Sequence, residues 1–164
     1  METREGLAWD IDRAAGDLAA VLVGCTDVEA GIRCGGDSRT VLAIANHVAE
    51  WLHLLAEVVP DLTRGRGDRL QDDVVDEIDA AFAKAAANRS LTETRSRLIE
   101  AARRLRLACD ALEEKDLSVV VQSDEPDVTV GSLLRRWGCD HVSEHTAMIR
   151  AGLLAADALA SDSP

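Results

Sequence analysis

The stretch His141-Val142-Ser143-Glu144-His145 determines how the whole chain is interpreted. Its two histidines are four residues apart, and residues at this spacing lie on one face of a helix with their Cβ atoms about 6 Å apart. Both imidazole rings can therefore point at one position. The chain has only four histidines in 164 residues, so the pairing is not a consequence of a histidine-rich composition.

The residues around this pair predict a long helix. Thr129 is a suitable N-cap, and the pattern continues to about Ala160. Gly152 continues the inner row without a side chain, so a close neighbour must pack there. The residues expected to face inward are Leu134, Trp137, His141, His145 and Met148.

A third histidine, His47, lies in a second apolar helical pattern. The helix is expected to begin after Ser38 and to end at about Val59, before Pro60. His47 takes the place of an apolar side chain in the middle of the core-facing row. That row comprises Ile44, His47, Trp51, Leu55 and Val58.

Three further helices follow from periodicity and from one capping motif. Apolar residues of the first helix recur from Leu7 until Gly24, and a shorter helix is expected around residues 74–82. Ser90 and Glu93 match the capping box, which predicts a helix reaching about Glu114. The segments 25–37 and 60–73 are expected to be loops, and 115–128 a short extended segment with a turn.

Composition supports an all-α fold in a single domain covering residues 1–164. Hydrophobic residues make up 47% of the chain and aromatic residues only 2%, so alanine, leucine and valine must form the core. This mixture favours close helix–helix packing over a β-sandwich. The expected architecture is a four-helix bundle with a long crossover between its second and third helices.

Net charge and hydropathy exclude several partners. The charge of −12 disfavours nucleic acid and anionic membranes. No apolar stretch is expected to approach the roughly 20 residues that span a bilayer, and the N-terminus lacks a secretory signal. A cytoplasmic location and no membrane partner are therefore expected. The four cysteines form no CxxC pair and are expected to be free thiols.

The histidines together predict a metal centre. Burying an unsatisfied polar group costs about 1–3 kcal/mol, and three facing imidazoles would make an unfavourable core unless a divalent ion bound them. His47, His141 and His145 are the predicted ligands, leaving open coordination positions as in catalytic sites. His53 lies about 240° around the helix from His47 and should not join. The alternative is that these are ordinary core histidines.

The same stretch matches the pattern H-x-x-E-H of inverted zinc proteases. That chemistry needs a further acidic ligand well downstream, and only Asp157 and Asp162 follow, near the end of the chain. This interpretation is therefore disfavoured. Glu144 remains a candidate base, or a residue that orients a histidine; the alternative is a solvated acid beside the ligands.

The order of these motifs resembles the DinB-like superfamily. The resemblance rests on His47-Val48-Ala49-Glu50-Trp51, on Thr129-Val130-Gly131-Ser132-Leu133-Leu134, and on the His141/His145 pair that follows. It is closest to the N-terminal domain of mycothiol-dependent maleylpyruvate isomerase. The resemblance implies an up-down-down-up bundle, a zinc or nickel ion held by His47, His141 and His145, and often a homodimer.

Two departures from that branch affect the expected function. Its isomerases usually carry a second, C-terminal domain, whereas this chain ends soon after the fourth helix, and some have an acidic ligand where His141 stands. The all-histidine set is more similar to the thiol S-transferases of the superfamily. The resemblance therefore implies a transferase or isomerase that uses a low-molecular-weight thiol such as mycothiol on a small electrophile. A metal-dependent hydrolase and a non-catalytic metal- or small-molecule-binding bundle remain alternatives.

Overall fold

The protein is helical throughout the part that the structure describes. The structure is a computed structural model that describes residues 3–34, 39–70, 72–123 and 125–161, without the side chains of 72–76 and 85–86. Within those residues the regular elements are helices, and the β-type pairings are isolated bridges. The predicted all-α class is therefore confirmed.

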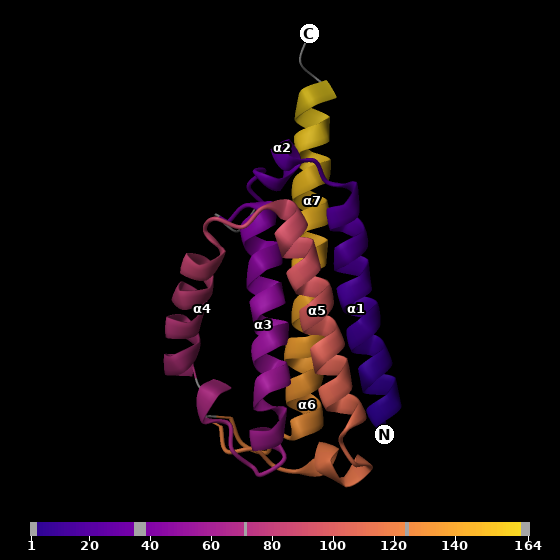
Figure 1. The fold of residues 1–164 in the computed structure, drawn as a ribbon, viewed down its shortest axis with the longest axis vertical. Coiled ribbons are helices and arrows are strands. Elements are labelled where there is room, and N and C mark those ends of the chain that lie inside the picture. The colour runs from indigo at the N-terminus through magenta and orange to yellow at the C-terminus, as the bar shows by residue number, and fades with distance from the viewer. Residues whose placement is uncertain (1–2, 35–38, 71, 124, 162–164) are drawn as a thin grey trace.

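The body of the fold consists of four long helices, which Figure 1 shows side by side. Each of them packs against two of the others: α3 against α5, α5 against α1, α1 against α7, and α7 against α3. The four therefore enclose a common interior. They are α1 (Arg4–Gly24), α3 (Val41–Leu62), α5 (Leu91–Asp110) and α7 (His141–Ser161).

Helix α4 (Asp72–Ala86) stands outside this group of four. It lies beside α3 and carries the chain from the lower end of α3 back to the upper end, where α5 begins (Figure 1). A short helical turn, η1 (Asp68–Leu70), precedes it. Because α4 packs mainly on α3 among the described residues, it covers one outer side of the helix that carries His47.

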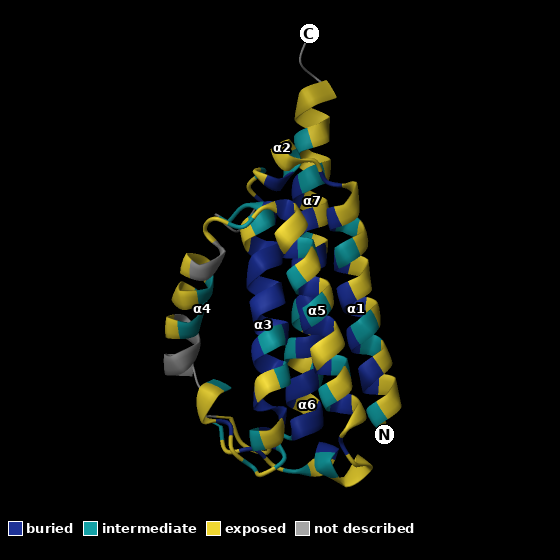
Figure 2. Ribbon diagram, in the orientation of Figure 1, coloured by how far each residue is buried: buried dark blue, intermediate teal, exposed yellow. Residues whose placement is uncertain are grey.

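Helix α3 is the central helix of the core. Fifteen of its 22 residues are buried, and Figure 2 shows burial along most of its length. Its length and hydropathy would allow it to cross a membrane, which corrects the expectation that no stretch approaches such a length. In this fold, however, 72% of that apolar window is buried inside the protein, as expected for a core helix.

The observed helix ends agree in part with those predicted from the sequence. Helix α1 ends at Gly24, and the predicted capping box of α5 is formed by Ser90 and Glu93. Helix α3 is capped by Thr40, whose hydroxyl accepts a hydrogen bond from the Ala43 amide; Ser38 lies outside the described residues. Pro60 does not end α3: it lies in the last turn, and its missing N–H removes one hydrogen bond there while the turns before it stay intact.

Several short elements were not predicted from the sequence. A four-residue helix, α2 (Asp27–Ala30), with its own capping box occupies part of the loop expected at 25–37. Helix α5 ends at Asp110, before the predicted end at about Glu114, and a 3₁₀ turn, η2 (Glu114–Ser118), follows it. The extended segment expected at 115–128 is reduced to that turn and single-residue bridges.

The predicted helix from Thr129 to Ala160 is one continuous helical path with an irregular turn. Helix α6 (Val130–Arg135) is capped by Thr129 as expected and leads into a π-helical turn, η3 (Arg136–Asp140), and then into α7. Such turns are frequent at functional sites because they insert an extra residue and change the direction of the side chains that follow. Here the turn immediately precedes His141.

Candidate metal centre

The three predicted ligands meet between two neighbouring long helices. His47 comes from the buried face of α3, and His141 and His145 come from the first turns of α7. One ligand atom from each residue lies within 4.8 Å of the others. The ring centroids are 5.2 Å apart for His47 and His141, 5.1 Å for His47 and His145, and 4.4 Å for His141 and His145.

The spacing of the nitrogens fits a small divalent ion. The Nε2 atoms of His47 and His141 are 3.1 Å apart. Two imidazole nitrogens bound to one tetrahedral zinc at the usual bond length are separated by roughly 3.3 Å. A set of neutral nitrogen donors at this distance suits zinc, nickel or another ion that prefers imidazole.

The environment keeps His141 uncharged at neutral pH. Burial, together with the nearby charges of His145 and Arg39, lowers the pKa of His141 to about 4. His47 and His145 are also buried, and His141 is half-buried. Because only a neutral imidazole can coordinate a metal, this environment favours binding by removing competition from protons.

A carboxylate on α4 orients His47 from behind. The Oδ1 atom of Asp79 lies 3.3 Å from His47 Nδ1 and accepts a hydrogen bond of 2.8 Å from the indole Nε1 of Trp51. A carboxylate on the outer nitrogen of a metal-binding histidine fixes the ring and its tautomer. This leaves Nε2 of His47 directed at the other histidines.

Asp79 was not among the residues predicted from the sequence to contribute to the site. The available signal was its position three residues before Phe82, which places both on one face of the short helix. That face packs on α3, and Phe82 contacts Trp51 with an edge-to-face geometry at 6.0 Å. The contact between Asp79 and His47 joins residues 32 positions apart, so it depends on the path of the crossover.

Aromatic side chains form one wall of the centre. Trp51 stacks on Trp137 with ring centroids 5.1 Å apart and planes 11° from parallel. Trp137 in turn contacts the edge of His141 at 5.2 Å. This stack packs the π-helical turn against α3 and restricts the orientation of the His141 ring.

The remaining two sequence candidates lie elsewhere. Glu144 is exposed, and no contact of its carboxylate with the three rings occurs among the described residues. His53 is half-buried and its Nε2 lies 3.2 Å from Glu57, outside the histidine cluster, as expected from its position on the helix. The four cysteines are buried free thiols, as predicted.

A buried charged network next to the centre joins α3 to α5. Glu50 accepts hydrogen bonds from Arg89 and from Arg97, and Asn46 accepts one from the Thr94 hydroxyl. Burial raises the pKa of Glu50, but the hydrogen bonds from the two arginines outweigh it and hold the pKa below its usual range. Glu50 is thus ionised, and it fixes α3 one turn beyond His47.

Fold and site together define an all-helical protein with a candidate three-histidine metal centre between two helices. The sequence model of the DinB superfamily matches residues 10–149. The chain therefore belongs to the DinB superfamily.

Comparison with solved structures supports the fold. The chain is similar to "Sibling Lethal Factor Precursor - DfsB", with a TM-score of 0.74 and 24% sequence identity over 92% of this chain and 94% of that one. At this identity the likeness concerns the fold alone. A search of the curated proteins finds no match.

Proposed function

We propose that this protein is a divalent-metal-dependent enzyme that activates a low-molecular-weight thiol for reaction with a small electrophile. The observation that carries the proposal is the convergence of His47, His141 and His145. Three protein ligands leave at least one coordination position open, which is the pattern of catalytic and not of structural sites. Membership of the DinB superfamily, which includes metal-binding enzymes, agrees with this function.

The three histidines would hold zinc or nickel through their ring nitrogens. A divalent ion with an open position lowers the pKa of a thiol or a water that binds there. Asp79 keeps the His47 ring in one orientation, and the Trp51–Trp137 stack shields one side of the centre from water. Glu144, which is exposed and next to His145 in the sequence, is proposed to pass the released proton to solvent by way of water, since its carboxylate does not contact the three rings.

Several finer features belong to the same proposal. The long helices follow an up-down-down-up order, the protein acts in the cytoplasm and forms a homodimer, and the thiol is mycothiol. Within the superfamily we place the chain nearest to the maleylpyruvate isomerase branch. The sequence motifs around His47 and His141 support that branch, whereas the all-histidine ligand set supports the thiol-transferase chemistry.

The direct test is thiol conjugation by metal-loaded protein. Zinc-loaded and nickel-loaded protein are mixed with mycothiol and a generic electrophile, beside chelator-treated protein and the His141→Ala variant. His53→Ala is the matched control, because His53 is on α3 but outside the cluster. The proposal predicts conjugation by loaded wild type and His53→Ala alone.

Other results of these assays would support one of the alternative functions. Cleavage of activated esters without thiol would indicate a metal-dependent hydrolase. Metal binding that raises thermal stability without any turnover would indicate a non-catalytic bundle. Conjugation equal to that of the chelator-treated control contradicts the proposed thiol chemistry.

A further inference from the structure

A cavity of about 440 Å³ opens beside the histidine cluster, between α3 and α4. His47 and Asp79 both line it, so the cavity borders both a predicted ligand and the residue that orients it. Its size lies in the range of sites for small molecules. A molecule bound there would have one end next to the candidate metal centre.

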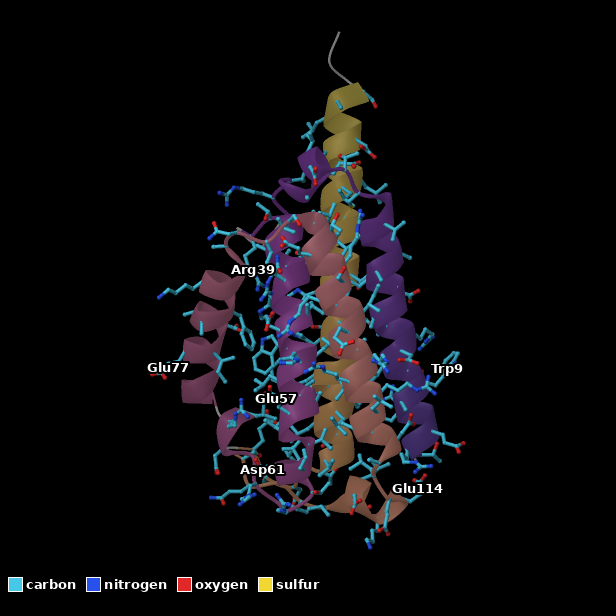
Figure 3. The ribbon with its side chains drawn as sticks, viewed as in Figure 1. Trp9, Arg39, Glu57, Asp61, Glu77 and Glu114 are labelled. Atoms are coloured by element: carbon cyan, nitrogen blue, oxygen red, sulfur yellow. The ribbon has the colours of Figure 1, made fainter. Side chains whose placement is uncertain are left out.

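The charges along this cavity are arranged with opposite signs. Arg39 is the one cationic residue among its described lining residues, and Figure 3 places it between the upper ends of α3 and α4. Asp79 is the one anionic residue among them. The charge of Arg39 reaches the cluster, because it contributes to lowering the pKa of His141.

The surface between these two charges is mainly apolar. The side chains of Leu42 and Ala43 come from the first turns of α3, and those of Phe82 and Ala83 come from α4. Asn46 adds a polar atom next to His47, but its amide group donates to Leu42 O and its oxygen accepts from Thr94. The cavity is therefore lined by one cationic side chain, an apolar wall and one acid beside His47.

We propose that this cavity binds a small monoanion with an apolar body, whose carboxylate lies at Arg39 and whose body lies against Phe82. A guanidinium binds a carboxylate through charge-assisted hydrogen bonds. A second anionic group would be repelled by Asp79, which favours monoanions over dianions. One part of this inference rests on the proposed function, namely that the end of the bound molecule opposite its carboxylate points toward the metal centre.

Three six-carbon probes test the proposal: hexanoate, neutral hexanamide and dianionic adipate. Their dissociation constants are measured by NMR titration of metal-free and zinc-loaded protein, with the Trp51 indole signal reporting the location. In metal-free wild type we expect hexanoate to bind more tightly than the other two. Arg39→Gln should weaken hexanoate binding about tenfold or more, the usual effect of losing a hydrogen bond to a charged group.

A control variant and a second test variant accompany Arg39→Gln. Arg103→Gln removes an exposed cation from α5, away from the cavity, and should leave hexanoate binding unchanged. Ala83→Leu partly fills the cavity at an exposed helical position and should weaken the binding of hexanoate. Unchanged binding by both Arg39→Gln and Ala83→Leu would overturn the proposal.

The outcomes separate this inference from the proposed function. Hexanoate that binds only zinc-loaded protein, and equally well to Arg39→Gln, would place its carboxylate on the metal; the inference would fail and the metal centre would stand. Arg39-dependent binding by a protein that takes up no zinc would support the inference alone. Equal affinity for hexanamide, or tighter binding of adipate, would also overturn the inference.

Discussion

At the scale of single residues, His47 is constrained on both of its ring nitrogens. Its Nε2 faces His141 at 3.1 Å, and its Nδ1 faces Asp79 at 3.3 Å. Asp79 is itself held by the Trp51 indole. The ring is thus oriented before any ion binds, which reduces the entropy cost of forming the site.

Replacement of Asp79 by asparagine should weaken metal binding about tenfold to hundredfold, the usual effect of losing a carboxylate behind a ligand histidine. The measurement is zinc affinity by competition with a chromophoric chelator. Glu77→Gln is the control, because Glu77 is an exposed acid on the same helix and points away from α3 (Figure 3). Equal affinities of the two variants would contradict the role of Asp79.

The pKa of His141 predicts an acid-sensitive metal-free protein. This pKa is about 4 in the folded protein against 6.5 for an ordinary histidine. His141 therefore takes up a proton more readily in the unfolded chain than in the folded protein. The contribution of neutral His141 to the free energy of unfolding is fully present above pH 6.5 and is lost as the pH falls toward 4. Thermal unfolding of chelator-treated protein over this range should show a steeper loss for wild type than for His141→Gln. Coinciding slopes would contradict the assignment.

At the scale of elements, one glycine of α7, Gly152, predicted that another segment of the chain packs closely against this helix. Gly152 was expected to need a close neighbour, and that neighbour is Cys34: an added Cβ would lie 3.1 Å from its Sγ and 3.2 Å from its Cα. Because one of these atoms belongs to the backbone, the contact cannot be relieved by a rotamer change alone.

Gly152→Ala should therefore destabilise the protein by about 1–3 kcal/mol, as overpacking of a tight contact does. Gly16→Ala is the matched control within α1, because nothing lies within 4 Å of its added Cβ. There the better helix propensity of alanine should stabilise by about 0.5–1 kcal/mol. Chemical denaturation measures both. A stabilising effect at Gly152 would show that α7 and Cys34 are farther apart than described.

Sequence signals from neighbouring residues predicted where helices begin and end better than they predicted an irregular turn within a helix. The capping box at Ser90 and Glu93 and the stop at Gly24 depend on neighbouring residues, and both were found as expected. The π-helical turn at residues 136–140 was missed, because the apolar spacing of Leu134, Trp137 and His141 runs through it without a break; Gly138 packs there against Ile11 and Leu105.

At the scale of the whole molecule, the sequence predicted which histidines meet but not what surrounds them. The spacing of His141 and His145 on one helix is local, and His47 was identified because it interrupts an apolar row. Asp79 and the cavity below Arg39 arise from the placement of α4 on α3. That placement is a long-range packing outcome with no periodic signature in the chain.

Binding of one divalent ion by three histidines from two helices is tested by elemental analysis of untagged protein purified without chelator. The samples are wild type, His47→Ala, His141→Ala and His53→Ala. We expect near-stoichiometric zinc or nickel in wild type and His53→Ala, and loss of the metal in the other two variants. If folded wild type contains no metal and also resists reconstitution, the three residues are ordinary core histidines and no metal centre exists.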